Sequence, residues 1–208
     1  MTSTTTSPAP VADALHLPRD VQDLLFREAR TANTFSDEPV SDEQLQAIYD
    51  LVKWAPTSMN TQPLRALVIR GAEGRRRLLP HMSEGNRAKT ESAPVTVVLA
   101  ADTDFHENLP KTFPHKPEAK NFFTDEAGRE GFARLNSLLQ IGYFIIGVRA
   151  AGLAAGPMTG FDSAGVDAEF FADRKWRSLV VINIGKPGDN PWFDRLPRLD
   201  YHEVVETL

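Results

Sequence analysis

Cysteine is absent from the 208-residue sequence. Its absence excludes a disulfide framework, a thiolate nucleophile and metal centres held by cysteine. It also fits a reducing compartment. Any chemistry that the protein performs must therefore depend on other groups.

An excess of positive charge is also missing, because 23 Lys and Arg face 28 Asp and Glu for a net charge of −5. Binding to nucleic acid needs a basic face that neutralises phosphates. The basic residues here are scattered, apart from three consecutive arginines at 75–77. A helix would point those side chains in different directions, so we interpret them as solvated helix surface. We expect no nucleic-acid partner.

Long hydrophobic runs are lacking too. No stretch reaches the roughly 18 consecutive apolar residues of a membrane span, and the N-terminal residues show no basic leader followed by an apolar run. We therefore expect a cytoplasmic protein without a membrane partner. The histidines do not show the paired spacing of helical metal sites. A metal-dependent hydrolase is thus a weak alternative, and its candidate ligands are His81, His106, His115 and His202.

The composition is typical of a folded globular protein, with 41% hydrophobic and 25% charged residues. Residues 1–18 are rich in Ser, Thr, Pro and Ala without apolar periodicity, which predicts a mobile N-terminal tail. The chain shows no internal repeat. We expect one domain over residues 19–208.

Helical and strand patterns alternate along this domain. Ser41 and Gln44 form a capping-box start for a helix that ends near residue 53. Apolar, β-branched runs predict strands at 64–70, 95–101 and 179–184, with a further helix at 71–80. The small-residue stretch 153–162 is interpreted as a loop. Alternation of this kind, taken alone, favours a parallel, doubly wound sheet.

Two longer segments differ from this pattern. Residues 132–151 are apolar on more than one face of a helix, which predicts burial either centrally or against another subunit. Residues 102–128, called the excursion below, contain three prolines and several aromatic side chains. The excursion is either a lid that shapes substrate access or a surface insertion without function.

Residues 54–63, called the 54–63 loop below, are the most informative stretch. Pro56 and Pro63 stop the preceding helix and prepare the following strand. Between them, hydroxyls and amides can donate and accept hydrogen bonds, which suits a planar heterocycle such as a flavin pyrimidine ring. The alternative is a simple helix stop with turn chemistry. The polar residues are Thr57, Ser58, Asn60 and Gln62.

Three spaced motifs lead to a family resemblance: PTS-x-N-x-QP at 56–63, GPMTGFD at 156–162 and LPRL at 196–199. In this order they resemble the nitroreductase family of FMN-dependent NAD(P)H oxidoreductases, from about residue 20 to the C-terminus. Finer details resemble the branch that includes the malonic semialdehyde reductase of pyrimidine catabolism. Those details are KWAPTSMN at 53–60, SEGNRAKT at 83–90, FPH at 113–115, INIG at 182–185 and RLPRL at 195–199.

The resemblance implies an α+β fold whose mostly antiparallel central sheet is flanked by helices. It also implies an intertwined homodimer with FMN at the interface, and the helix at 132–151 fits the dimer core. These expectations replace the parallel sheet that alternation alone favoured.

The resemblance further implies a phosphate-binding element at Arg30, Thr31 and Asn33. Asn33 stands where a basic residue is common. Arg198 matches the C-terminal arginine that binds the same phosphate, and Leu196 replaces a frequent lysine. Arg195 is the candidate to compensate for that loss.

The remaining implied cofactor contacts surround the flavin ring. The resemblance assigns a loop that reaches the ring from the partner subunit, an asparagine at the pyrimidine edge, and a small-residue segment whose backbone at Thr159 and Gly160 donates to flavin N5. Taken alone, Asn86 and Gly160 would indicate only turns. The residues assigned are Pro56, Thr57, Ser58, Asn60, Asn86, Pro157, Met158, Thr159 and Gly160.

The implied activity passes a hydride from NADH or NADPH through flavin N5 to a small acceptor, with no catalytic protein side chain and no metal. The sequence has neither a nicotinamide-binding glycine fingerprint nor a G-x-S-x-G element. The favoured acceptor is malonic semialdehyde, reduced to 3-hydroxypropionate. Nitroaromatics or quinones, and a flavin-binding protein without turnover, are alternatives. Cations that could attract an acidic acceptor are Lys53, Arg65, Lys111 and His115.

Overall fold

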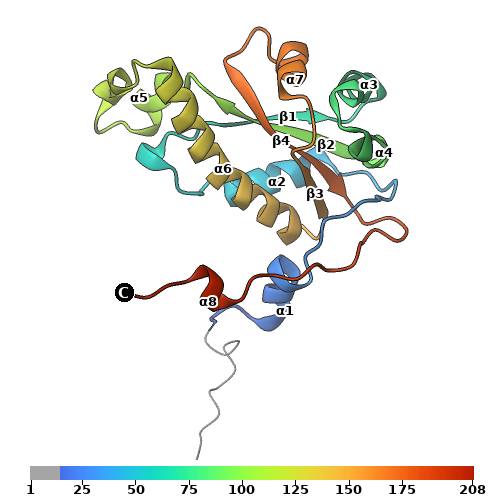
Figure 1. Cartoon of the computed structure of the whole chain (residues 1–208). Helices are drawn as coiled ribbons and strands as arrows, with labels where there is room; N and C mark the ends of the chain where they lie inside the picture. Colours follow the sequence, from blue (N-terminus) through green and yellow to red (C-terminus); the bar gives the residue numbers. More distant parts are fainter. Residues whose placement is uncertain (1–14) are drawn as a thin grey trace, which may run out of the picture.

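The computed structural model describes residues 15–208, so the predicted mobile tail lies outside the described residues except for 15–18. The centre is a four-stranded antiparallel sheet in the order β1-β2-β4-β3 (Figure 1). Its strands are β1 (Leu64–Ile69), β2 (Val95–Asp102), β3 (Ala154–Met158) and β4 (Trp176–Gly185). The α+β fold implied by the resemblance is confirmed, and the parallel sheet is wrong.

The parallel interpretation failed because the two central strands are covered on both faces. All eight residues of β2 are buried. Strands buried on both sides are continuous apolar runs, which is also how parallel strands look in a sequence. Successive side chains still point to opposite faces of the sheet, since Val97 and Leu99 belong to one core cluster and Val98 belongs to the other.

Helices cover both faces of the sheet (Figure 1). One face carries α2 (Asp42–Val52) and α6 (Glu126–Ala150), which pack in the larger core cluster. The other carries α3 (Ala72–Leu78), α4 (Glu84–Ser92) and α7 (Ser163–Phe170). The capping box predicted for α2 is present, with the Ser41 side chain accepting from the Gln44 amide at 3.2 Å.

Helix α6 is buried on one side and exposed on the other. Ile141, Phe144 and Val148 pack on the sheet, whereas Leu135 and Leu139 are 62% and 49% exposed. Of the two predicted alternatives, central burial holds for one side of the helix, and burial of the other side against another subunit stays a prediction. Within residues 15–208, α6 is also the one helix long and apolar enough to cross a membrane, with 44% of its most apolar window buried, a test that core helices pass as well.

Several predicted boundaries moved. The predicted loop 153–162 contains strand β3, and helices α4 and α7 were not predicted. The first helix is short: α1 (Arg19–Gln22) continues only as a π-helical turn at Asp23–Arg27. The excursion folds into short helical turns, including α5 (Leu109–Thr112), and residues 186–200 carry no regular element before α8 (Tyr201–Val204).

Candidate functional site

The segment after α1 lies between the edge of β3 and the C-terminal segment (Figure 1). Thr31 forms a parallel bridge with Ala155 of β3. On the other side, the Asn33 amide donates to the Pro191 carbonyl at 3.0 Å, and Thr34 Oγ1 donates to the Asp189 carbonyl at 2.7 Å. Two chain ends that are far apart in sequence are thereby held side by side.

These segments enclose a cavity of about 280 Å³, called the arginine cavity below. It brings together all five residues that the resemblance assigned to phosphate binding. Their role stays a prediction, but their convergence was expected. The lining residues are Ala29, Arg30, Thr31, Asn33, Arg149, Phe193, Asp194, Arg195, Leu196 and Arg198.

The charge of the arginine cavity is strongly positive. Within residues 15–208, none of its four arginines has a carboxylate oxygen within 4.0 Å, although Asp194 contributes to the lining. Arg30 donates to the Phe193 carbonyl, and Arg198 donates to the Leu196 carbonyl at 3.0 Å. Guanidinium groups without carboxylate partners bind phosphate and carboxylate oxygens well. The cavity therefore suits an anion.

Arg149 was missed by the sequence interpretation. It lies in the last turn of α6, where a basic residue is explained by the helix dipole and gives no signal of a binding site. Its Nη1 donates to the Leu25 carbonyl at 3.1 Å. Its Nε is buried without a hydrogen-bond partner among the described residues, and burial lowers the pKa of Arg149.

A second group of predicted residues meets beyond the other end of β3. Asn86 Nδ2 donates to the Gly160 carbonyl at 2.9 Å, and the Ser83 amide donates to the same oxygen at 3.0 Å. A Cβ on Gly160 would lie 2.7 Å from Asn86 Nδ2, so a larger residue would displace the Asn86 side chain from this contact. Pro157 and Met158 are the last residues of β3, and Thr159 joins them to Gly160.

Strand β3 sets the distance between the two groups. The bridge to Thr31 is at Ala155, and Thr159 follows four residues later, which corresponds to about 13 Å of extended chain. The arginine cavity and the Asn86–Gly160 contact thus lie along one edge strand. This spacing is on the scale of an extended mononucleotide.

The 54–63 loop has a constrained backbone. Met59, Asn60 and Gln62 have φ values of 54°, 51° and 45°, in the left-handed region that side chains other than glycine rarely adopt. The Gln62 amide donates to Thr57 Oγ1 at 3.2 Å. The loop contains a short 3₁₀ turn at Ser58–Asn60, and residues 61–63 then lead into β1.

Two polar side chains of α6 hold this loop, and the sequence interpretation missed both. Asn136 Oδ1 accepts from the Ser58 amide at 2.7 Å, and Gln140 Oε1 accepts from the Leu64 amide at 3.0 Å. Asn136 is only 2% exposed. The available signal was the spacing of two polar residues, four apart, on an otherwise apolar helix face.

The 54–63 loop does not meet the Asn86–Gly160 contact within one chain. The loop leads into β1, whereas Gly160 follows β3, and these strands are opposite edges of the sheet. Three strand spacings of about 4.8 Å separate them, and the loop is held by α6 on the other face from α4. Contacts from both groups to one ligand would require a second copy of the chain.

Comparison with known proteins shows the family of this chain. Residues 26–186 match the family described as "Nitroreductase family". The chain belongs to the nitroreductase family. A Streptomyces griseus protein named "Putative NADH dehydrogenase/NAD(P)H nitroreductase" is 61% identical over 196 residues, which cover 94% of this chain and all of that protein. A protein of the same name from Leptothrix cholodnii is 52% identical, over 88% of this chain and 94% of that protein.

Solved structures show that the nitroreductase fold is shared. An Exiguobacterium sibiricum structure, described as a putative nitroreductase in complex with FMN, superposes with a TM-score of 0.80 at 18% identity, covering 93% of this chain and 99% of that one. A Staphylococcus epidermidis structure, described as a putative NAD(P)H:FMN oxidoreductase, gives 0.79 at 19% identity, over 93% of this chain and 98% of that one. At these identities the likeness shows the fold alone.

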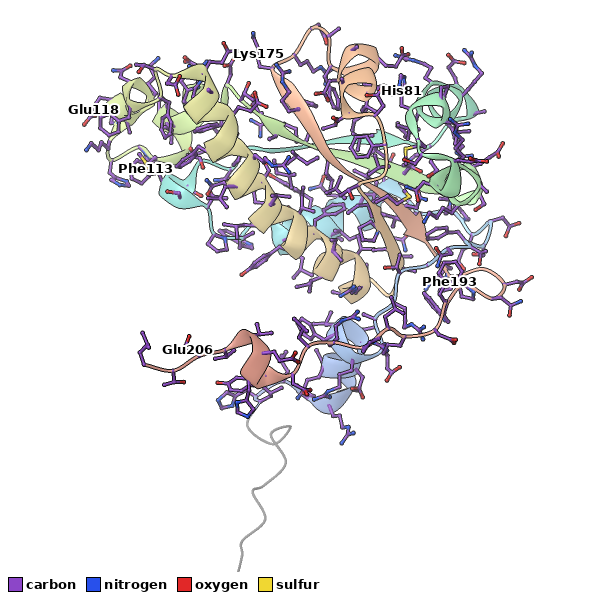
Figure 2. The ribbon with its side chains drawn as sticks, viewed as in Figure 1. His81, Phe113, Glu118, Lys175, Phe193 and Glu206 are labelled. Atoms are coloured by element: carbon purple, nitrogen blue, oxygen red, sulfur yellow. The ribbon has the colours of Figure 1, made fainter. Side chains whose placement is uncertain are left out.

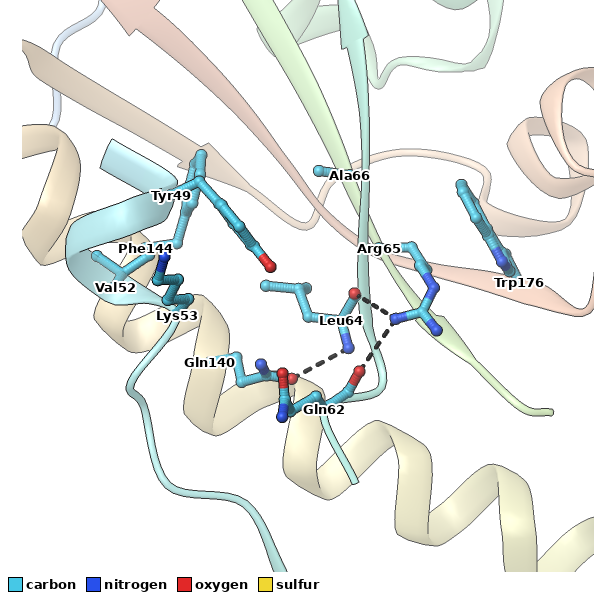
Figure 3. Close-up of a pocket in the computed structure, with 10 residues that line it drawn as sticks. All are labelled: Tyr49, Val52, Lys53, Gln62, Leu64, Arg65, Ala66, Gln140, Phe144 and Trp176. Carbon is cyan, nitrogen blue, oxygen red and sulfur yellow. Dashed lines mark hydrogen bonds between the residues drawn. The ribbon is translucent and has the colours of Figure 1, made fainter. Parts of the chain in front are cut away.

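Two of the candidate cations of this chain are already paired. They line a cavity of about 320 Å³ beside β1 (Figure 3). Lys53 Nζ lies 2.7 Å from Asp50, and Arg65 Nη2 lies 2.7 Å from Asp102. Arg65 also donates to two backbone carbonyls beside it (Figure 3). Paired cations are less available to an acidic substrate.

The other two cations, Lys111 and His115, lie on the excursion, and neither has a carboxylate within 4.0 Å among the described residues. Asn60 Nδ2 donates to the Thr112 carbonyl at 2.8 Å, so the excursion lies against the 54–63 loop. Figure 2 shows Phe113 at the opposite end of the molecule from Phe193 of the arginine cavity. A substrate held near the excursion would thus be remote from this chain's own arginine cavity.

The histidine alternative gains no geometric support. In the part of the chain that the structure describes, no three His, Asp or Glu side chains come together in a way that could hold a metal ion. His81 follows α3, His106 and His115 belong to the excursion, and His202 lies in α8. The four candidate ligands are therefore spread over three parts of the fold.

Proposed function

We propose that this nitroreductase-family protein is an FMN-dependent NAD(P)H oxidoreductase that works as a homodimer. The observation that carries the proposal is the placement of an unpaired arginine cavity and the Asn86–Gly160 contact along one edge strand, β3. A phosphate at the first and a ring at the second would orient one mononucleotide along β3.

The phosphate end fits the residues present. Arg30, Arg195 and Arg198 would bind the phosphate oxygens through charge-assisted hydrogen bonds, and Thr31 would add a hydroxyl. Asn33 contributes differently, because its amide groups face the carbonyls of Thr31 and Pro191. Asn33 therefore holds the walls of the cavity together in place of a charged contact.

The ring end is divided between two chains. Asn86 and the backbone of residues 157–160 would contact the ring from the chain that binds the phosphate. The partner's 54–63 loop would contribute Pro56, Thr57, Ser58 and Asn60. When bound, FMN supplies the hydride chemistry, so the chain needs no nucleophile of its own. The protein side chains position the ring and the acceptor.

The homodimer is supported by the uncovered side of α6. Leu135, Leu138, Leu139 and Tyr143 are each at least 40% exposed on one helix. Such apolar surface favours contact with another protein surface. A second copy of the chain at this surface would also bring a second 54–63 loop.

For the acceptor, we favour malonic semialdehyde, whose aldehyde would be reduced to the alcohol of 3-hydroxypropionate. This choice rests on the finer sequence resemblance and on two basic side chains without carboxylate partners in the described chain, Lys111 and His115, which flank the Thr112 carbonyl bound by Asn60 of the 54–63 loop. A carboxylate on the acceptor would be attracted to them. Nitroaromatics and quinones are the alternative acceptors, and either NADH or NADPH is the reductant. The cytoplasmic location and the single domain stay predictions.

The first experiment is an absorbance spectrum of the protein after reconstitution with FMN and desalting, followed by anaerobic addition of NADH or NADPH. We expect oxidised-flavin bands that bleach with reductant. A colourless protein would contradict the proposal, and bound flavin that never bleaches would support the non-catalytic alternative.

The acceptor is tested separately by steady-state kinetics. Replacing Lys111 and His115 by Gln should raise KM for malonic semialdehyde and leave KM for a neutral quinone unchanged. Lys53→Gln, whose cation is already paired, is the matched control. An equal change for both acceptors would reject the role of these cations.

A further inference from the structure

Arg149 reaches the arginine cavity from an element that carries none of the other cavity cations. Arg30 comes from the segment after α1, and Arg195 and Arg198 come from the C-terminal segment. Arg149 comes from the end of α6, which packs under the sheet. Its position is thus set by the core and not by either chain end.

Among the described residues, the Arg149 side chain makes one hydrogen bond and leaves other donors unused. Nη1 donates to the Leu25 carbonyl, and Nε is buried without a partner within residues 15–208. A buried N–H group without an acceptor is unfavourable. The helix dipole explains why a cation is tolerated here, but it provides no acceptor for Nε.

The positive charge of the arginine cavity also favours a bound anion. Arg149 shares one cavity with Arg30, Arg195 and Arg198, and none of them has a carboxylate within 4.0 Å in the described chain. Like charges in one cavity repel each other, and partial burial weakens their hydration. A dianion offsets both costs.

We propose that Arg149 binds the phosphate of the mononucleotide and supplies positive charge that is missing at Asn33 and Leu196. This inference rests on the proposed function. It goes beyond it by adding a phosphate contact from α6 that the resemblance does not assign. The phosphate is then held by the core helix as well as by the two chain ends.

The test compares the dissociation constants of FMN and riboflavin, which differ by the phosphate. We expect R149M, which keeps an apolar stem, to weaken FMN binding about 10- to 100-fold and to leave riboflavin binding unchanged. R149K should recover part of the loss. R134M removes an exposed arginine from the same helix and is the matched control.

Equal losses for FMN and riboflavin would overturn the proposal, because a structural role affects both ligands alike. Unchanged FMN binding would overturn it as well. If R149M does not fold, R149K makes the same comparison, and loss confined to FMN remains the supporting result. Failure of the unmodified protein to bind either flavin would instead reject the proposed function itself.

Discussion

A buried polar network joins the helix that carries Asn86 to the sheet, and the energy of the hydrogen bonds in this network can be measured. Asn183 of β4 is fully buried. Its Oδ1 accepts from Thr96 Oγ1 at 2.9 Å, and its Nδ2 donates to Thr90 Oγ1 at 3.3 Å. Thr90 lies one turn after Asn86 on α4, so the network ties that helix to the sheet.

Replacing Asn183 by Leu keeps the volume similar but removes both contacts. The Thr96 hydroxyl would then be buried without an acceptor, at a cost of about 1–3 kcal/mol. The Thr90 hydroxyl loses less, because it only accepts from Asn183 and its own hydrogen is donated to Met158 Sδ at 3.9 Å. Part of the total is offset by burial of the leucine, so we expect N183L to be destabilised by about 1–3 kcal/mol.

The decisive variant is the double mutant. T96V removes the stranded hydroxyl, so T96V/N183L should be closer to the unmodified protein than N183L alone, with a coupling energy of about 1–2 kcal/mol. Urea unfolding at one protein concentration and one FMN concentration measures all four proteins comparably. Strictly additive losses would refute the reasoning, because they would mean that Thr96 finds another partner.

Three further predictions concern the site and its supports. N136L removes the acceptor of the Ser58 amide, worth about 1 kcal/mol, so hydrogen exchange at that amide should accelerate; unchanged exchange would contradict this. G160A should weaken riboflavin binding about tenfold or more, whereas G71A, whose Cβ meets nothing within 4 Å, should not; equal affinities would exclude the close approach. A hydrogen bond from Arg77 of α3 lowers the pKa of Glu169 below its ordinary 4.5, so the stabilisation from this contact is present above pH 4.5 and is lost as the pH falls further. E169Q should therefore reduce the dependence of Tm on pH in the acid range, and an unchanged dependence would contradict this prediction.

Local sequence patterns correctly predicted the elements whose structure depends mainly on their own residues. The capping box predicted the start of α2, and the apolar runs predicted β1, β2 and β4. Strand β3 was misread because its sequence contains Gly156 and Pro157, which are unusual in strands. Proline is compatible with an edge strand, and β3 is an edge of this sheet. Edge position is a property of the whole fold.

The same difference between local and long-range signals applies to the residues of the candidate site. The resemblance located the residues around the arginine cavity and the Asn86–Gly160 contact, whose motifs are local. It did not locate Asn136, Gln140 or Arg149. Asn136 and Gln140 meet their partners across 78 and 76 residues of chain, and no local pattern encodes such a contact. The one signal of these contacts in the sequence was the presence of polar residues in a mostly apolar helix.

The contact between the two chain ends has a consequence for protein synthesis. Arg30 and the Phe193 carbonyl that it meets are 163 residues apart. Closing so long a loop is entropically costly until the intervening sheet has formed. The wall of the arginine cavity is completed only when Arg195 and Arg198 have left the ribosome. The proposed phosphate binding would therefore follow translation of residue 198, and a product terminated before Arg195 would lack two of the four arginines of the cavity.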